Sequence, residues 1–327
     1  MTKKVTIEEM AAWLTTRDDF VVMGHVTPDG DATGSTIALC HALRRLGKRA
    51  VVCLPGGVPL MYSFLPGADE VIETGNPLPF EPQTALVMDV SSLDRLGEQG
   101  LALFERCPSR AVIDHHNTNL GFGDVILLDG DASATCEIAV FVVKAMGLSL
   151  TLEEGECLFL GISTDTGHFN YVNTRKESFQ AAEQCVAAGI DIARMTERLY
   201  RTRTQARTHL MGLVLAGLRV SEDGQMAWAF LTQAMRDQVH ARMEDNEGIV
   251  SYLVEIEGVI FAVLVEERGN VTKLSMRSRA PLNVAEAVAV PLGGGGHARA
   301  AGASVALPMD EALEKALNLA RRALSGE

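Results

Sequence analysis

Histidine and aspartate residues gather in one short segment directly after an apolar run near the N-terminus. The segment GHVTPDGDATGS, residues 24–35, places His25, Asp29 and Asp31 within seven residues of one another. Imidazole nitrogen and carboxylate oxygen are ligands for hard to borderline divalent cations. The segment therefore indicates part of a metal site, whose remaining ligands must come from elsewhere in the chain.

More groups of the same kind follow later apolar runs: Asp89, Asp114, His115, His116 and Asp165. A single aspartate in such a position is more often a turn or helix-capping residue. Their recurrence indicates instead that they all lie at strand ends, where one sheet edge would bring them together. So many carboxylates could not stay ionised side by side without cations. Two ions about 3.5 to 4 Å apart, bridged by one carboxylate, are common in enzymes that hydrolyse phosphate esters.

The apolar runs have the length and composition of strands that are buried on both faces. We expect such strands at residues 20–24, 49–54, near 71, 84–90, 109–114 and 123–129. Helical spacing at 35–47 lies between the first two, which predicts a parallel βαβ unit. Further helices are expected at 6–16 and from 131 to about 190. The pattern predicts an α/β domain over 1–190 with a doubly wound, mainly parallel sheet and its site at the C-terminal strand ends.

The rest of the chain has a different pattern. Residues 191–217 read as a helical connector rich in arginine, which either faces the substrate or forms a solvated polar surface. Two β-hairpins are expected around residues 223–224 and 269–270. Helices are expected at 232–254, 284–290 and 309–323. These elements predict a smaller α/β domain over 218–327.

Composition excludes several classes of protein. The formal net charge of −13 argues against the broad basic surface that grips long nucleic acid. No apolar run approaches 18 residues, and the N-terminus lacks the apolar core of a signal peptide. The six cysteines show no CxxC pair, as expected in a reducing compartment. We therefore expect a cytoplasmic protein without a membrane partner.

Four motifs give a resemblance to a known family. In chain order, HVTPDGDATGS, VMDVSSLDRLG, VIDHHNTN and GISTDTGHFNY resemble the signature blocks of the DHH phosphoesterase family, which is named after the triplet at 114–116. SMRSR at 275–279 and GGGGHARAAG at 293–302 resemble the DHHA1 domain that accompanies DHH in one branch. The pairing is similar to the NrnA group, nanoRNases that degrade very short RNA and dephosphorylate 3′-phosphoadenosine 5′-phosphate (pAp).

The resemblance implies two divalent ions, most readily Mn²⁺ for imidazole and carboxylate ligands, with Mg²⁺ as the alternative. His25 and Asp29 would hold one ion, Asp31, His115 and Asp165 the other, and Asp89 would bridge both. A hydroxide between the ions would attack the phosphate. Asp114 would accept a hydrogen bond from a ligand imidazole, and His116 would contact the scissile phosphate.

The resemblance also implies a phosphate-binding patch in the C-terminal domain, so that the active site would lie in the cleft between the domains. Glycines lack Cβ, so Gly294, Gly295 and Gly296 could bring backbone amides close to a phosphate and open a short helix at His297. Arg277 offers a planar fork for phosphate oxygens, and Ser275 lies two residues before it.

The motifs leave several alternatives open. Short RNA and pAp are the expected substrates, but cyclic di-AMP or a linear dinucleotide would suit the same ions. A catalytically silent RNA- or nucleotide-binding module is the alternative from a different class. The preferred RNA length, the cleavage direction, the role of His168 and a homodimer also stay open.

Overall fold

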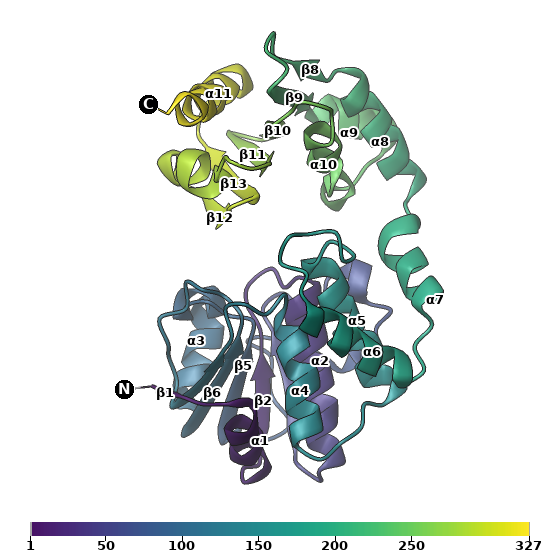
Figure 1. Cartoon of the computed structure of the whole chain (residues 1–327), viewed down its shortest axis with the longest axis vertical. Helices are drawn as coiled ribbons and strands as arrows, with labels where there is room; N and C mark the ends of the chain where they lie inside the picture. Colours follow the sequence, from purple (N-terminus) through teal and green to yellow (C-terminus); the bar gives the residue numbers. More distant parts are fainter. Residues whose placement is uncertain (1, 327) are drawn as a thin grey trace. The chain divides into compact units, whose positions relative to one another are not determined.

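The computed structural model describes residues 2–326. The chain divides into two compact units, Met1–Arg201 and Thr202–Glu327 (Figure 1). The division falls inside the segment that we expected to be a connector. That segment contains α7 (Ile192–Thr196), a π-helix (Glu197–Arg201) and α8 (Gln205–Ala216).

The first unit contains a seven-stranded sheet in the order β1-β7-β6-β5-β2-β3-β4, and every pairing in it is parallel. The strands are β1 (Lys3–Lys4), β2 (Phe20–Met23), β3 (Ala50–Leu54), β4 (Ile72–Glu73), β5 (Thr84–Met88), β6 (Ser109–Asp114) and β7 (Val125–Leu128). Six of them confirm the predicted strands. Sequence pattern did not reveal β1, because two lysines at a sheet edge carry no apolar signal. The chain passes from β2 to β3 on one side and later to β5 on the other, so the sheet is doubly wound.

Helices cover both faces of this sheet (Figure 1). They are α1 (Ile7–Thr15), α2 (Gly30–Arg45), α3 (Gly97–Arg106), α4 (Thr135–Ala145), α5 (Leu152–Asp165) and α6 (Lys176–Ala187), with short 3-10 turns at Leu60–Tyr62, Ala68–Glu70 and Leu93–Leu96. Side chains alternate along β2, so Val21 and Met23 pack towards α3, whereas Phe20 and Val22 pack towards α1, α2 and α4. Burial on both faces explains the continuous apolar run.

Glycines let α2 and α5 pack in direct contact. A Cβ on Gly34 would lie 2.2 Å from the carbonyl oxygen of Cys157, and one on Gly30 would lie 2.5 Å from Oγ1 of Thr164. Any larger residue would push the helices apart. This close approach brings the start of α2 beside the end of α5.

The second unit contains a six-stranded sheet in the order β12-β13-β11-β10-β9-β8. Its strands are β8 (Arg219–Val220), β9 (Met226–Leu231), β10 (Phe261–Arg268), β11 (Val271–Ser278), β12 (Gly295–His297) and β13 (Ala300–Val305). Both predicted hairpins, β8–β9 and β10–β11, are present as antiparallel pairs. The pair β9–β10 is parallel, which makes the sheet mixed.

Helices also cover this second sheet. They are α9 (Gln233–Val239), α10 (Ile249–Val254) and α11 (Met309–Ser325), with a π-helix at Ala285–Ala289 and 3-10 turns at Met243–Asn246 and Val290–Leu292. Along β10, Ala262 and Leu264 pack in the cluster that contains α8 and α10, whereas Val263 and Val265 pack in the cluster that contains α11. Among the described residues, no helix is both long and apolar enough to cross a bilayer.

The expected helix at His297 was wrong, because Gly295–His297 form the edge strand β12. A Cβ on Gly294 would lie 2.1 Å from the carbonyl oxygen of Gly302, and one on Gly296 would lie 2.5 Å from that of Ala300. The glycines therefore permit a strand to lie unusually close to β13, which a sequence pattern alone does not distinguish from a helix-opening loop.

Candidate functional site

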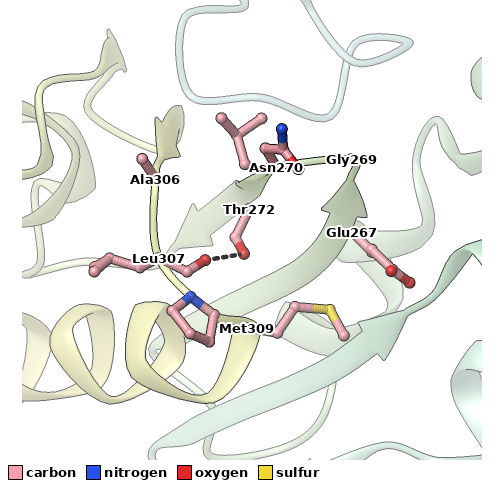
Figure 2. A pocket seen from close by; sticks show the side chains of 9 residues that line it. Glu267, Gly269, Asn270, Thr272, Ala306, Leu307 and Met309 are labelled. Atoms are coloured by element: carbon pink, nitrogen blue, oxygen red, sulfur yellow. Dashed lines mark hydrogen bonds between the residues drawn. The ribbon is translucent and has the colours of Figure 1, made fainter.

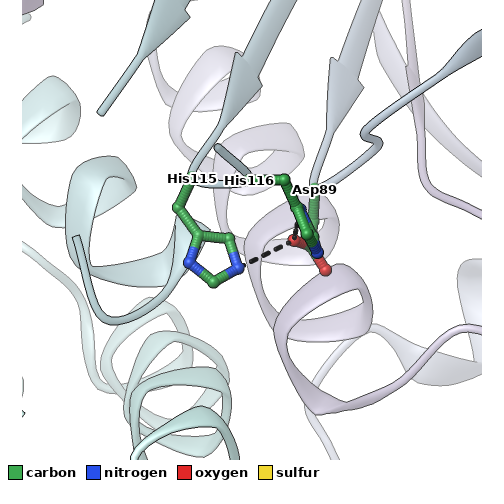
Figure 3. Close-up of side chains that lie close together, drawn as sticks. All are labelled: Asp89, His115 and His116. Atoms are coloured by element: carbon green, nitrogen blue, oxygen red, sulfur yellow. Dashed lines mark ion pairs between the residues drawn. The ribbon is translucent and has the colours of Figure 1, made fainter. Parts of the chain in front are cut away.

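The predicted groups of the first unit converge at the C-terminal edge of the parallel sheet. His25 follows β2, Asp89 follows β5, and Asp114 is the last residue of β6, so three adjacent strands deliver them. Two sets of side chains have donor atoms within 4.8 Å of one another: His25, Asp29 and Asp89 in the first set, and Asp31, His115 and Asp165 in the second. Asp89 also forms a third such group with His115 and His116 (Figure 3).

Asp89 lies between the two sets. Its Oδ2 is 3.5 Å from Nε2 of His25, and its Oδ1 is 3.5 Å from Nε2 of His115. The side chain is only 2% exposed, and the backbone adopts a left-handed conformation with φ of 59°. A buried carboxylate with one oxygen directed at each set has the arrangement of a ligand shared by two ions.

The first set is organised by the start of α2. Asp29 is the N-cap of that helix, and its Oδ1 accepts hydrogen bonds from the backbone amides of Asp31 and Ala32, both at 3.0 Å. Its Oδ2 lies 3.7 Å from Nε2 of His25. Nδ1 of His25 lies 2.9 Å from the carbonyl oxygen of Val26, which can only accept. Nδ1 therefore donates to Val26, which directs Nε2 towards the carboxylates of Asp29 and Asp89.

The second set combines the first turn of α2, the end of β6 and the end of α5. Nε2 of His115 lies 3.9 Å from Oδ2 of Asp31 and 3.4 Å from Oδ2 of Asp165. Nδ1 of His115 lies 3.1 Å from the carbonyl oxygen of Ala132, which leaves Nε2 as the unprotonated nitrogen. Asp165 is the last residue of a helix, so its expected place at a strand end was wrong. It reaches the site because α5 packs directly on α2.

Asp114 holds the imidazole of His116. Its Oδ1 accepts from Nδ1 of His116 at 2.8 Å and from the backbone amide of His115 at 2.9 Å, and its Oδ2 accepts from Nδ2 of Asn119 at 2.7 Å. Asp114 was expected to hold the imidazole of a ligand histidine. That expectation was wrong, because the ring of His115 bonds to Ala132 instead.

The electrostatics of the site favour bound cations. Burial and the neighbouring Asp89 raise the pKa of Asp31 to about 7, and burial together with Asp31 raises the pKa of Asp165 well above its usual value. Burial lowers the pKa of His25, but hydrogen bonds and attraction from Asp29 and Asp89 outweigh it and raise the pKa to about 10. These carboxylates are too close together to ionise fully without positive charge beside them.

The structure adds residues that sequence reasoning missed. The backbone amides of Thr135 and Cys136 donate to Asp31 at 2.6 and 2.7 Å, and Oγ1 of Thr135 donates to Oδ1 of Asp89 at 3.2 Å. In the sequence, the segment DASATCE at 131–137 indicates only that a helix begins there, and nothing in it points to contacts with Asp31 or Asp89. The guanidinium of Arg95 also lies 3.2 Å from Nδ1 of His25.

In the second unit, strand register aligns the predicted phosphate-binding residues. Arg277 on β11 pairs with Ala300 on β13, which pairs with His297 on β12. Ser275 and Gly295 are aligned in the same way through Gly302. Residues directly opposite one another share a face of the sheet, so Arg277 and His297 lie on one face, about 10 Å apart over two strand spacings. Gly294 precedes β12, and Gly296 lies within it.

A pocket of about 390 Å³ lies at the other end of these strands (Figure 2). It is lined by the β10–β11 turn and by residues 306–309, where Oγ1 of Thr272 donates to the carbonyl oxygen of Leu307 at 2.6 Å. None of the predicted site residues lines it. The pocket is therefore separate from the aligned residues around Arg277.

Comparisons with known proteins match this architecture. The DHH family, N-terminal domain, matches residues 19–162, and the DHHA1 domain matches residues 224–326. A protein from Thermus thermophilus named bifunctional oligoribonuclease and PAP phosphatase NrnA is 33% identical over 92% of this chain and 89% of its own length. One of the same name from Bacillus subtilis is 27% identical over 91% of this chain and 92% of its own.

A solved structure shares the fold. An exopolyphosphatase-related protein from Bacteroides fragilis superposes with a TM-score of 0.91 at 27% identity, covering 97% of this chain and 95% of the other. The four sequence motifs, the parallel sheet with its converging carboxylates and these matches lead to one conclusion. The chain belongs to the DHH family of phosphoesterases, in the branch that carries a C-terminal DHHA1 domain.

Proposed function

We propose that this protein is a two-metal phosphoesterase that hydrolyses short oligoribonucleotides to 5′-mononucleotides and converts pAp to AMP. The observation that carries the proposal is the position of Asp89, whose two oxygens face His25 and His115 at 3.5 Å each. Relatives that match over nine-tenths of the chain and bear names for both activities support the choice of substrates.

The residues of the site fit two divalent ions. The first would be held by His25 and Asp29 and the second by Asp31, His115 and Asp165, with Asp89 shared between them. The mixture of imidazole and carboxylate suits Mn²⁺ best, with Mg²⁺ as the alternative. When bound, such ions polarise the phosphate and lower the pKa of attacking water.

His116 is proposed to serve the leaving group. Burial lowers its pKa, but the hydrogen bond that His116 donates to Asp114 and the attraction of the nearby Asp89 outweigh this effect and raise the pKa to about 9, so the ring is protonated near neutral pH. Because Nδ1 donates to Asp114, Nε2 is the nitrogen that would donate to the leaving oxygen.

The second unit is proposed to bind the substrate phosphate that is not cleaved. Arg277 and His297 share a face of the sheet, with Ser275 and the backbone of Gly294, Gly295 and Gly296 beside them. The formal net charge of −13, which offers no broad basic track for a long strand, favours short RNA over long strands. The six free, buried cysteines support action in the reducing cytoplasm.

Product analysis tests the substrate. The purified full chain would be given 5′-labelled RNAs of 2 to 24 nucleotides, pAp and cyclic di-AMP in parallel, with Mn²⁺ or Mg²⁺. We expect mononucleotides from the shortest RNAs and AMP from pAp, at rates well above that for the 24-nucleotide RNA. Equal rates on the longest and shortest RNAs would contradict the proposal, and faster cleavage of cyclic di-AMP would favour that alternative substrate.

Metal analysis separates the enzyme from a nucleotide-binding module without activity. Mass spectrometry of the protein after dialysis against Mn²⁺ should find two ions per chain. A protein that binds short RNA but holds no metal and releases no product would support the binding module instead.

A further inference from the structure

The loop after β7 and the first turn of α4, residues 129–137, touch the second ligand set from several directions; we call this segment the 129–137 bracket. The carbonyl oxygen of Ala132 lies 3.1 Å from Nδ1 of His115 and so fixes the tautomer of that ring. Two backbone amides of the bracket, those of Thr135 and Cys136, donate to the two oxygens of Asp31 at 2.6 and 2.7 Å. The bracket therefore orients both an imidazole and a carboxylate of this set.

The third member of the set is tied to the same bracket through a bridge. Nδ2 of Asn173 donates to the carbonyl oxygen of Ser133 at 3.2 Å and to that of Asp165 at 3.1 Å. The end of α5 is thus fastened to the bracket next to the point where Asp165 enters the site.

The first ligand set is organised differently. The ring of His25 bonds to its neighbour Val26, and Asp29 bonds to amides of its own helix. Between residues 2 and 326, no hydrogen bond in the structure joins the bracket to His25 or Asp29. Oγ1 of Thr135 donates to Asp89 at 3.2 Å, but to Oδ1, the oxygen that faces His115 of the second set. A substitution that disturbs the bracket should therefore weaken metal binding by the second set more than metal binding by the first.

An ion pair between a buried glutamate and a partly exposed arginine fixes the bracket. Glu137 is 0% exposed; its Oε1 accepts from Nε of Arg175 at 2.7 Å, and its Oε2 accepts from Oγ of Ser133 at 2.6 Å and of Ser178 at 2.8 Å. Nη2 of Arg175 also donates to Oδ2 of Asp129 at 2.7 Å. One guanidinium thus binds both ends of the bracket, a geometry that the planar fork of arginine allows and a lysine cannot reproduce.

We propose that the Arg175–Glu137 ion pair is a positioning element for one metal site: it holds the 129–137 bracket so that Asp31, His115 and Asp165 are preorganised for an ion. Neither residue belongs to either ligand set. The inference rests on the proposed function in one respect, because it assumes two ions bound by the two sets. Groups that orient metal ligands in this way usually affect metal affinity by about 10- to 100-fold.

The test measures Mn²⁺ binding to the full chain by calorimetry, in two backgrounds that each retain one site. His25→Gln removes a ligand of the first set, so the remaining ion reports on the second. Asp165→Asn removes a ligand of the second set, so the remaining ion reports on the first. Glu137→Gln is then introduced into each background. Arg175→Lys is made as a second variant in case Glu137→Gln fails to fold.

Glu154→Gln serves as the matched control. Glu154 is also 0% exposed in the first unit, and it pairs with Nη1 of Arg45 at 2.7 Å. It lies in the first turn of α5, at the opposite end of that helix from Asp165. The Glu154→Gln substitution should therefore lower the melting temperature as the bracket variants do, but it should leave the affinity for Mn²⁺ unchanged in both backgrounds.

We expect the bracket variants to weaken binding by about 10-fold or more in the His25→Gln background and by less than about threefold in the Asp165→Asn background. Equal losses in the two backgrounds, no loss in either, or the same selective loss in the Glu154→Gln control would overturn the inference. A native chain that binds fewer than two ions would instead overturn the proposed function, which keeps the two failures distinct.

Discussion

His116 donates a hydrogen bond from Nδ1 to Oδ1 of Asp114 over 2.8 Å. Asp114 is 0% exposed and ends a central strand, so it cannot turn away from the ring. The pair resembles an imidazole oriented by a buried carboxylate, as in other acid–base sites. Nδ1 of His116 also lies 3.6 Å from Oδ1 of Asp89. The Asp114–His116 pair is therefore next to the proposed metal centre.

Asp114→Asn should therefore lower kcat by about 100-fold, because the ring loses the carboxylate that fixes its tautomer and keeps it protonated. Metal content should stay at the native level, since Asp114 bonds to the second ligand set only through the backbone amide of His115, which the side-chain oxygen of asparagine can still accept. Steady-state kinetics on pAp and metal analysis of the same sample measure both effects. Asp69→Asn, at an exposed position in a 3-10 turn, is the control. Unchanged kcat would contradict the role of His116.

Asp89→Asn should reduce the number of bound ions below two and lower turnover by at least about 100-fold. Asparagine is the right replacement because the backbone at this position is left-handed, with φ of 59°, which asparagine tolerates better than alanine. Circular dichroism should show native folding. A variant with two ions and full turnover would contradict the shared position of Asp89.

Gly34→Ala should destabilise the protein by about 1–3 kcal/mol, because its Cβ would lie 2.2 Å from a backbone carbonyl of α5 that cannot rotate away. Moving α2 away from α5 should also weaken the binding of the ion that Asp31 and Asp165 are proposed to hold. Gly212→Ala is the matched control, since it also lies within a helix but its Cβ would have open space. It should stabilise by about 0.4–1 kcal/mol. Chemical denaturation and Mn²⁺ titration test both; equal stability changes would refute the packing argument.

Without metal, the protein should lose stability as pH rises from about 4, near the unfolded pKa of an aspartate, to about 10, the pKa of His25 in the folded state. The raised pKa values of Asp31, about 7, and His25, about 10, mean that the folded state holds these protons more tightly than the unfolded chain does. The resulting stability is present at low pH and is lost as pH rises through these values. Melting curves with chelator should show this fall, and Mn²⁺ should raise the melting temperature more at pH 8 than at pH 6. A flat profile with chelator would contradict the clustering of charges.

Arg277→Lys and Arg277→Ala should each raise KM for pAp by about 10- to 100-fold, because a charged hydrogen bond to phosphate is lost or weakened. The effect on kcat should be small. Lys273→Ala is the control, since Lys273 lies on the same face of β11 four residues earlier, beside the hairpin turn. It should change KM by less than about threefold. An Arg277→Lys variant with native KM would argue against a bidentate phosphate contact.

The sequence by itself determined most of the first unit. Continuous apolar runs predict buried strands because a parallel sheet is covered on both faces, and six of the seven strands of that sheet were found in this way. The ligand-type residues could be named because their chemistry is a property of each side chain. The resemblance to the DHH family, and not the spacing of the residues, implied the division of these ligands into two sets, and the distances around Asp89 are compatible with that division.

Only the tertiary structure decided which element brings each group to the site and what surrounds it. Asp165 arrives from the end of a helix because glycines at Gly30 and Gly34 let α2 and α5 touch. Asp114 holds His116 rather than a ligand imidazole, and the glycine run forms a strand because it lies against β13. The contacts of Glu137 and Arg175 with the 129–137 bracket were likewise invisible in the sequence. Each depends on close approach between segments far apart in the chain, which no local pattern encodes.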